Sequence, residues 1–244
     1  MKVIYEPKGR AKEYADLAVN LYNGCSHGCE YCYAPRVMHK KNEEYFKTQK
    51  PRLGVIAGLN YDLRELYENK DDREVLLCFT CDPYQHIDEE YKITRQAIAG
   101  FILYNQKFSI LTKGGKRSER DFDLIAKYAE ICRYGATLVF ANDDHSKQYE
   151  PGAAPTSERI EVLKKAHGLG IKTWVSLEPA WSYADVWSLI NRTHEFVDEY
   201  KIGKLNYHPH AKEIEWEAFK EGVVDLCESL GVNYTLKQDL KVLK

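Results

Sequence analysis

Short apolar segments alternate along this chain with longer amphipathic ones, and this alternation limits the folds open to it more than any other feature. The apolar segments span residues 17–22, 75–80, 108–112, 136–141, 172–177 and 203–207. Apolar residues recur at helical spacing over residues 53–69, 89–104, 119–133, 183–200 and 213–230, and a hydroxyl with an early acid opens another helix near 155–159. Short apolar runs are typical of buried strands, and the repeated strand–helix order predicts an α/β fold with a parallel sheet.

The number of repeats narrows the architecture. Six repeats are fewer than the eight that close a full barrel, and the pattern alone also allows an open doubly wound sheet. Both architectures place functional residues at the carboxyl ends of the strands. Residues 233–244 are expected to add a strand or a short helix, and no linker or repeat requires a second domain. We therefore expect one domain over residues 1–244.

Three cysteines with the spacing C-x3-C-x2-C follow the first predicted strand: Cys25, Cys29 and Cys32. Three thiolates on one loop can hold three irons of a [4Fe–4S] cluster and leave the fourth iron open to a small molecule. A structural zinc site is the alternative, with His27 or the Cys78/Cys81 pair completing the ligands, but zinc ligands usually come as two spaced pairs. The seven cysteines are an odd number, and no secretion signal precedes them, so disulfides are not expected.

This cysteine spacing, with a tyrosine before the third cysteine, resembles the radical S-adenosylmethionine (SAM) superfamily. Further segments resemble its spore photoproduct lyase and "DNA repair photolyase"-like branch, in the same order along the chain: residues 7–15, 20–25, 31–36, 81–85, 111–113 and 176–179. The resemblance implies an open (β/α)6 partial barrel of the TIM type with a short C-terminal extension. It also implies a [4Fe–4S] cluster and SAM as cofactors, with the three cysteines as metal ligands.

The resemblance and the strand-end rule together nominate residues that contact SAM. We expect Lys113 and Arg159 at its carboxylate, Asn142 at its ribose, and Tyr31 and Tyr33 at its adenine. Thr80 and Asp82 occupy the position of the amino-group motif, and Ser176 and Glu178 follow the fifth strand as further cofactor contacts. Structural roles are the alternatives: Arg159 can pair with an acid on its own helix, and Asn142 can cap a turn.

Two further features have weaker functional interpretations. Spore photoproduct lyase uses a cysteine near its second strand as hydrogen donor, and Cys78 lies in the corresponding strand here. Cys81, at the end of that strand, is more exposed to the site and is our catalytic candidate. Cys78, inside the strand, is more consistent with a core thiol. The pair His208 and His210 suggests a second metal site, although a loop feature is the more common reason for such spacing.

These parts predict an enzyme that reductively cleaves SAM to methionine and a 5′-deoxyadenosyl radical, which abstracts hydrogen from a substrate. A nucleic-acid lesion is one substrate class, and a small molecule, nucleotide or peptide is another; a non-enzymatic iron–sulfur or zinc protein is the third alternative. An electron donor such as flavodoxin or ferredoxin is implied. Charge is balanced, with 35 Lys and Arg against 37 Asp and Glu, which does not give the basic footprint of a dedicated duplex-DNA binder. No apolar run is long enough to cross a membrane, and we expect a cytoplasmic protein.

Overall fold

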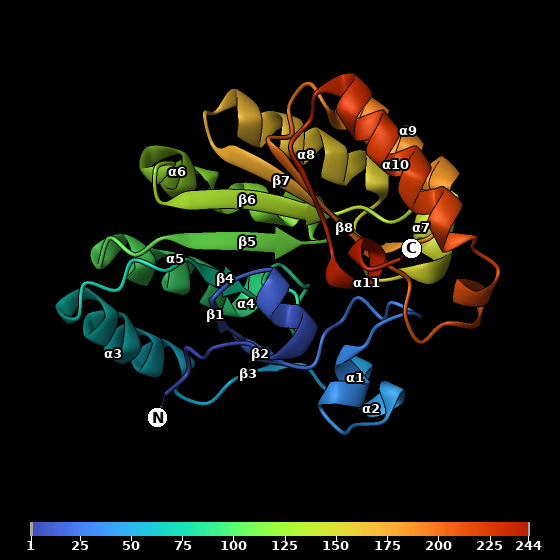
Figure 1. Ribbon diagram of the computed structural model, residues 1–244. Helices are drawn as coiled ribbons and strands as arrows, with labels where there is room; N and C mark the ends of the chain where they lie inside the picture. Colours follow the sequence, from blue (N-terminus) through green and yellow to red (C-terminus); the bar gives the residue numbers. More distant parts are fainter. Residues whose placement is uncertain (1, 244) are drawn as a thin grey trace.

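A seven-stranded, all-parallel sheet organises the computed structural model, which describes residues 2–243. The strands follow one another in chain order across the sheet (Figure 1). They are β1 (Leu17–Val19), β4 (Val75–Leu77), β5 (Phe108–Thr112), β6 (Cys132–Thr137), β7 (Lys172–Ala180), β8 (Glu199–Lys204) and β9 (Tyr234–Leu236). A separate antiparallel pair joins β2 (Tyr22–Asn23) to β3 (Lys50–Pro51). The main sheet curls into a half-barrel with one open side.

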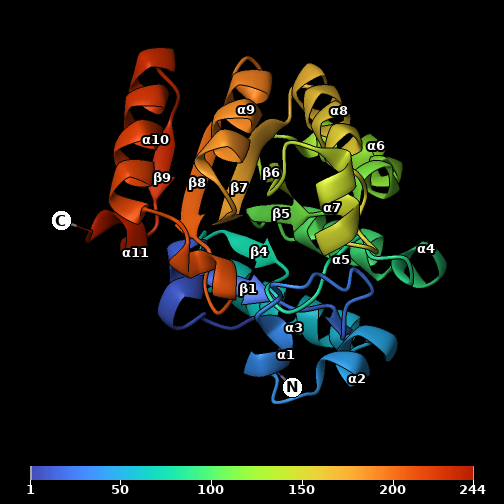
Figure 2. The ribbon, with the colours of Figure 1, turned by 90° about the vertical axis from the view of Figure 1, so that its right-hand side faces the viewer.

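The long helices cover the convex face of this sheet, as Figures 1 and 2 show. They are α3 (Val55–Glu68), α5 (Ile93–Leu103), α6 (Phe122–Ile125), α8 (Thr156–Gly168), α9 (Tyr183–Thr193) and α10 (Trp216–Leu230). Short helices gather near the carboxyl ends of the strands or in the connections: α1 (Ala34–Val37), α2 (Asn42–Lys47), α4 (Asp88–Tyr91), α7 (Asp143–Tyr149), α11 (Gln238–Lys241) and the 3₁₀ turns η1 (Gly9–Glu13), η2 (Gly115–Asp121), η3 (Ala126–Tyr128) and η4 (Pro209–Lys212). Helices on one face only distinguish this half-barrel from a doubly wound sheet.

The two faces of the sheet hold different kinds of side chain. The large hydrophobic core lies between the convex face and the helices, whereas the concave face carries a small cluster around Trp174. The indole lies over Gly135 of the neighbouring strand, where an added Cβ would come within 2.4 Å of the ring. Arg133 and Lys201 each approach the same ring at 5.6 Å. The interior of the half-barrel is therefore filled by one aromatic ring between two cations.

The N-terminal segment crosses the open side of the half-barrel. Tyr5 forms an antiparallel bridge with Ala18 on the free edge of β1. Beyond it, η1 meets the C-terminal α11, where Arg10 pairs with Asp239 at 2.5 Å. Lys237 donates to the Arg10 carbonyl at 2.9 Å. These contacts join the first and last strands without a sheet hydrogen bond between them.

The predicted partial barrel is confirmed, and its strand count and two of its boundaries are corrected. The C-terminal extension supplies both a strand and a short helix, so the parallel sheet has seven strands instead of six. Strand β6 begins at Cys132 inside the helix predicted over 119–133, and β8 begins at Glu199 inside the helix predicted over 183–200. Inward positions on these strands carry charges that interrupt the apolar runs typical of strands. Arg133 pairs with Glu74 and Glu199, and Lys201 donates to the Tyr14 carbonyl at 3.0 Å.

No helix within residues 2–243 is long and apolar enough to cross a membrane.

Candidate active site

The three motif cysteines lie on a loop that leaves β2 and enters α1, beside the carboxyl ends of the main strands. Gly24 opens the loop with φ +78°, in the left-handed region that favours glycine. A Cβ at this position would meet the Tyr45 carbonyl oxygen at 2.7 Å. The N–H of Cys25 donates to that same carbonyl at 3.4 Å. Glycine is required before the first cysteine because α2 packs directly on the loop backbone.

Two other segments hold the cysteine loop from its remaining sides. The N–H of Ser26 donates to the Gln85 side chain at 2.9 Å. The N–H of Glu30 donates to the Tyr149 carbonyl at 2.9 Å, and the N–H of Gly152 donates to the His27 carbonyl at 2.8 Å. The loop conformation is thus fixed by residues that follow β4 and β6.

Of the three cysteines of this loop, Cys29 is buried, and Cys25 and Cys32 are partly exposed. Cys25, Cys29 and Cys32 form no disulfide. Burial raises the pKa of all three, that of Cys29 to about 12. Backbone N–H groups of His27 and Ala34 donate to the sulfurs of Cys25 and Cys32. Because metals bind thiolates, loading iron here must displace protons, and the N–H donors stabilise the resulting anionic sulfurs.

A buried hydroxyl beside these sulfurs has no partner of its own among residues 2–243. The Tyr45 side chain is 1% exposed and its hydroxyl forms no hydrogen bond. The charges of Cys25 and Cys32 act on this phenol, although burial is the larger cause of its raised pKa. Within residues 2–243 no three His, Cys, Asp or Glu side chains converge on a single ion. A cubane does not require such convergence, because each thiolate binds a different iron, so the donors present fit a [4Fe–4S] cluster.

Lys113, after β5, lies between the cysteine loop and a buried carboxylate. Its ammonium lies 3.8 Å from Glu150 and 5.5 Å from the centre of the Tyr31 ring. Burial alone would lower the pKa of Lys113, but Cys29 and Glu150 outweigh it and keep the group cationic. Tyr31 donates its hydroxyl to Glu150. The predicted cofactor residues Lys113 and Tyr31 are therefore brought together next to the second cysteine.

Arg159, on α8, binds the same Glu150 carboxylate, and every nitrogen of its guanidinium group is hydrogen-bonded within the protein. It pairs with Glu150 at 2.5 Å and donates to the carbonyls of Ala154 (2.7 Å) and Thr137 (2.9 Å) and to the Ser146 hydroxyl (3.1 Å). Burial tends to raise the pKa of Glu150, but Arg159 and Lys113 lower it, so the group is a carboxylate. The helix pairing with Glu158 or Glu161 is not what the structure shows. Arg159 holds Glu150 in place, and Lys113 is the better placed cation for a ligand.

Asp82 and Thr80 both follow the end of β4, but their side chains differ in hydrogen bonding. Asp82 accepts from the Thr112 hydroxyl at 2.6 Å and from the Lys113 N–H at 2.7 Å. Its contact with the His27 ring at 3.5 Å ties the cysteine loop to two strand ends. Thr80 is 9% exposed, and its hydroxyl has no partner among residues 2–243. Asp82 is thus committed to the scaffold, whereas Thr80 has a donor and acceptor to offer a ligand.

Cys78 and Cys81 lie against each other just beyond β4. Both thiols are buried, and the Cys81 side chain hydrogen-bonds to that of Cys78. Burial, followed by this contact, raises the pKa of Cys78. Tyr33 lies nearby, half exposed, and donates its hydroxyl to the Phe79 carbonyl at 2.7 Å. The predicted adenine contact Tyr33 and the predicted catalytic Cys81 therefore share one side of the loop.

Ser176 and Glu178 point into the half-barrel, where Tyr14 meets both. The Tyr14 hydroxyl lies 2.7 Å from the Ser176 hydroxyl and donates to Glu178 at 2.6 Å. Lys237 pairs with Glu178 at 3.2 Å and lies 4.0 Å from the centre of the Tyr14 ring. These two predicted cofactor residues thus already have protein partners from both ends of the chain.

Asn142 and the two histidines have structural roles in this arrangement. The Asn142 side chain caps α7 by accepting from the N–H of Asp144 at 2.6 Å. His208 pairs with Glu30 at 3.3 Å. His210 stacks on Trp181 with ring centres 4.8 Å apart. The capping alternative fits Asn142, while its ribose contact stays a prediction.

Three site residues escaped the sequence analysis. Glu150 gave no signal, because its burial depends on Lys113 after β5 and Arg159 on α8. Tyr14 falls within a segment that carries the family resemblance, but no role was assigned to it. Tyr45 lies in a segment for which the sequence analysis predicted no element and no role. Of the three, only Tyr14 lies in a segment that the sequence already pointed to.

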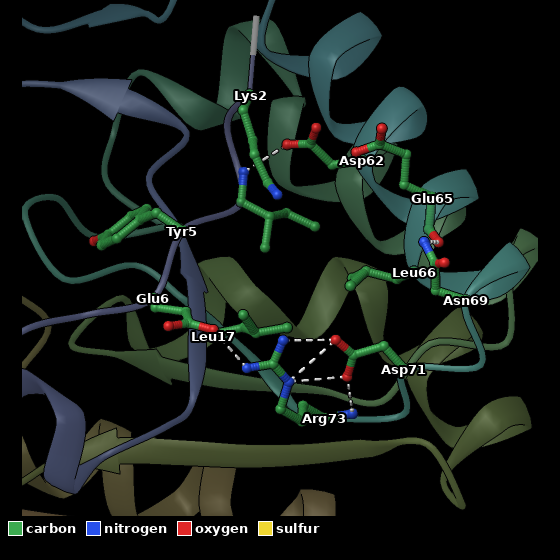
Figure 3. A pocket seen from close by; sticks show the side chains of 11 residues that line it. Lys2, Tyr5, Glu6, Leu17, Asp62, Glu65, Leu66, Asn69, Asp71 and Arg73 are labelled. Atoms are coloured by element: carbon green, nitrogen blue, oxygen red, sulfur yellow. Dashed lines mark hydrogen bonds and ion pairs between the residues drawn. The ribbon is translucent and has the colours of Figure 1, made fainter.

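A cavity of about 340 Å³ lies elsewhere, between the N-terminal segment and α3 (Figure 3). Its wall includes Arg73, which pairs with Asp71 at 2.6 Å and with Glu6 at 2.8 Å. The carboxylate of Asp62 accepts from the N–H of Val3 at 2.6 Å. Arg73 and its two carboxylate partners satisfy one another, and the cavity is separate from the cysteine loop, so we do not assign it to the reaction.

Comparison with known proteins places this site in a family. The profile of the Radical SAM superfamily matches residues 19–178. An uncharacterized protein of Methanocaldococcus jannaschii is 30% identical over 79% of this chain and 71% of its own length, and one of Mycobacterium tuberculosis is 28% identical over 66% of this chain and 48% of its own. The chain thus spans about half the length of the mycobacterial relative.

Solved structures share the fold. Spore photoproduct lyase with bound dinucleoside spore photoproduct superposes with a TM-score of 0.71 at 14% identity, covering 95% of this chain and 78% of that one. Streptococcus suis SuiB bound to S-adenosylmethionine gives 0.68 at 13% identity, covering 90% of this chain and 49% of that one. With the family profile spanning most of the chain, the half-barrel and its cysteine loop establish that this protein belongs to the radical SAM superfamily.

Proposed function

We propose that this chain is an enzyme that binds a [4Fe–4S] cluster through Cys25, Cys29 and Cys32 and cleaves SAM reductively. With SAM bound, such a cluster supplies the electron that splits the sulfonium into methionine and a 5′-deoxyadenosyl radical able to take hydrogen from a substrate. The observation that supports this most is the gathering of three free thiols, the Lys113 cation and a Thr80 hydroxyl without a partner among residues 2–243 at one end of the sheet.

The chain's own residues then bind and orient SAM. Lys113 faces the cysteine loop and is charged, so we assign it to the SAM carboxylate. Glu150 limits where that ammonium can lie, and Arg159 holds Glu150. The Thr80 hydroxyl is assigned to the amino group. Tyr31, and Tyr33 on the other side of Cys32, are assigned to the adenine.

We propose a nucleic-acid lesion as the substrate class. Two exposed tyrosine rings near the cysteine loop support it, Tyr33 beside Cys81 and Tyr207 under the Arg36 guanidinium at 4.5 Å. Aromatic faces of this kind stack on bases without reading sequence. Cys81 is assigned to contact the substrate, as the thiol at the strand end. A small molecule, nucleotide or peptide is the alternative, which the balanced charge of the chain favours.

Anaerobic reconstitution with iron and sulfide, followed by dithionite and SAM, tests the central claim. We expect about four irons per chain and release of 5′-deoxyadenosine. The same assay in deuterated buffer with thymine-dimer DNA, and separately with a cell extract, shows whether turnover depends on nucleic acid. A fully loaded protein that forms no 5′-deoxyadenosine under any of these conditions would contradict the proposal.

A further inference from the structure

Helices α1 and α2 form a basic face immediately outside the cysteine loop. Residues 36–52 contain six Lys and Arg against two Glu, a net charge of +4, whereas the whole chain carries −2. Arg36, Lys40, Lys41, Lys47 and Lys50 are exposed. The segment stands out from the body of the molecule at the lower right of Figure 1, coloured blue. Positive charge is therefore concentrated here against an acidic remainder.

This face packs directly against the cysteine loop. A Cβ added to Gly24 would lie 2.7 Å from the Tyr45 carbonyl oxygen and 3.0 Å from that of Thr48. The buried Tyr45 phenol is close enough to the thiols of Cys81, Cys25 and Cys32 for their charges to act on it. The other sides of the loop are covered by residues around Gln85 and by the segment from Tyr149 to Gly152. SAM is assigned to the strand-end side, next to Lys113. A carrier that approaches over α2 therefore reaches the cysteine loop without crossing the side assigned to SAM.

The composition of the face favours a protein partner over a nucleic acid. Two of its lysines are paired with carboxylates on α2, Lys40 with Glu44 at 2.5 Å and Lys47 with Glu43 at 2.6 Å. Val37 is 57% exposed among the cations, an apolar contact of the sort that protein interfaces bury. Within residues 2–243, Lys41 and Lys50 form no ion pair and so are the cations available to a partner.

We propose that the α1–α2 face, defined by residues 36–52, is the docking site of an acidic one-electron carrier protein that reduces the cluster. This inference rests on the proposed function, since it presumes a cluster to reduce. Opposite charge on the carrier steers it to the face, and tunnelling over the short path through Tyr45 then delivers the electron. A small reductant such as dithionite does not need this face.

The test compares two double variants of the reconstituted holoenzyme. K41E/K50E removes all four units of excess charge from the face. K127E/K172E makes the same charge change at exposed lysines near the amino ends of the strands, on the opposite side of the sheet. Reduction of the cluster by an acidic reduced flavodoxin is followed by stopped-flow absorbance and by electron paramagnetic resonance, alongside 5′-deoxyadenosine formation with dithionite.

At low salt we expect K41E/K50E to slow flavodoxin-driven reduction about tenfold or more, and K127E/K172E to leave it within about twofold. Both variants should match the parent with dithionite, and the difference should shrink as salt rises. Equal flavodoxin rates in the two variants would overturn the proposal. So would loss of binding to a single-stranded oligonucleotide in K41E/K50E with flavodoxin reduction intact, which would make this a nucleic-acid face. Failure of the proposed function looks different: no 5′-deoxyadenosine forms even with dithionite, while cluster reduction still reports on docking.

Discussion

The convex and concave faces of the main sheet are formed by the same strands but carry different kinds of side chain. On the convex side, alternate residues such as Val75 and Ile202 pack into one continuous apolar core under the helices. On the concave side, their neighbours include Arg133, which binds Glu74 at 2.7 Å and Glu199 at 2.6 Å around Trp174. The convex face requires only apolar side chains of the right size, whereas the concave face requires particular partners.

The difference teaches where a ligand can be accommodated. Concave polar groups fall into two sets, those that the protein satisfies and those that it leaves without partners. Glu178 belongs to the first set, whereas the hydroxyls of Thr80 and Ser109 and the indole N–H of Trp174 belong to the second within residues 2–243. Burying a hydroxyl without a partner is unfavourable unless something else binds it. Among these groups Thr80 follows the end of β4, near the cysteine loop, so it is the one expected to meet a ligand.

The largest difference is expected between replacing the cysteines of the loop and replacing those of the convex core. Cys25→Ala, Cys29→Ala or Cys32→Ala should each prevent normal iron loading and reduce 5′-deoxyadenosine to background. Cys132→Ala and Cys227→Ala, on the convex core, should keep iron and activity and cost on the order of 1 kcal/mol of stability. Iron and acid-labile sulfide analysis with denaturant unfolding measures both. Normal activity in any loop variant would contradict the assignment.

Breaking the buried ion pair between Arg159 and Glu150 should have the next largest effect on stability. Arg159→Met leaves the Glu150 carboxylate buried without its main partner, and such losses cost about 3–5 kcal/mol. Lys165→Met removes an exposed pair with Glu119 and should cost less than about 1 kcal/mol. Urea unfolding of the two variants gives the comparison. Similar costs would mean that the buried pair is not a structural support of the site.

Lys113→Met tests the cation that faces the loop. Loss of a charge-assisted hydrogen bond of about 1.5–3 kcal/mol should raise the Kd for SAM roughly tenfold to a hundredfold. Iron content should stay normal, because Lys113 is not a ligand. Lys116→Met is the matched control, because Lys116 lies three residues further along the chain and pairs with Glu161 at 3.2 Å. Equilibrium dialysis with labelled SAM measures both, and an unchanged Kd in Lys113→Met would refute the carboxylate assignment.

Glu74 gives the concave face a pH dependence. Burial tends to raise its pKa, but Arg133 outweighs this and lowers it from 4.5. The unfolded chain therefore binds the proton more readily, so the contribution of Glu74 to stability is present above about pH 4.5 and is lost as pH falls below it. Glu74→Gln should lower stability at pH 7 by about 1–2 kcal/mol and flatten the loss between about pH 5 and 3. Glu6→Gln, an exposed partner of Arg73, should change the slope less.

The smallest effect is expected from Tyr45→Phe. Its hydroxyl has no partner among residues 2–243, so removing it should change the stability of the iron-free protein little. In the loaded protein, loss of a donor near the cluster sulfurs should make the cluster harder to reduce. Redox titration followed by electron paramagnetic resonance measures the midpoint potential, and Tyr61→Phe, an exposed tyrosine on α3, is the control. An unchanged potential would show that the hydroxyl does not contact the cluster.

The sequence predicted what depends on local spacing and missed what depends on distant partners. The spacing of Cys25, Cys29 and Cys32 predicts the cysteine loop, because three thiolates at this spacing can bind one cluster. The strand–helix alternation predicts the half-barrel. The start of β8 was missed because Glu199 and Lys201 interrupt the apolar pattern, and their partners, Arg133 and the Tyr14 carbonyl, are far away in the sequence. Glu150 was missed because its partners are also distant in the sequence. A buried charge cannot be distinguished from a surface charge until the residues that neutralise it are known.

The Trp174 indole packs on Gly135 and occupies the middle of the half-barrel. Under the proposed function, SAM and the substrate would both have to approach the cysteine loop from the carboxyl ends of the strands. Binding of one would then restrict access for the other, so the order of binding would become part of the mechanism.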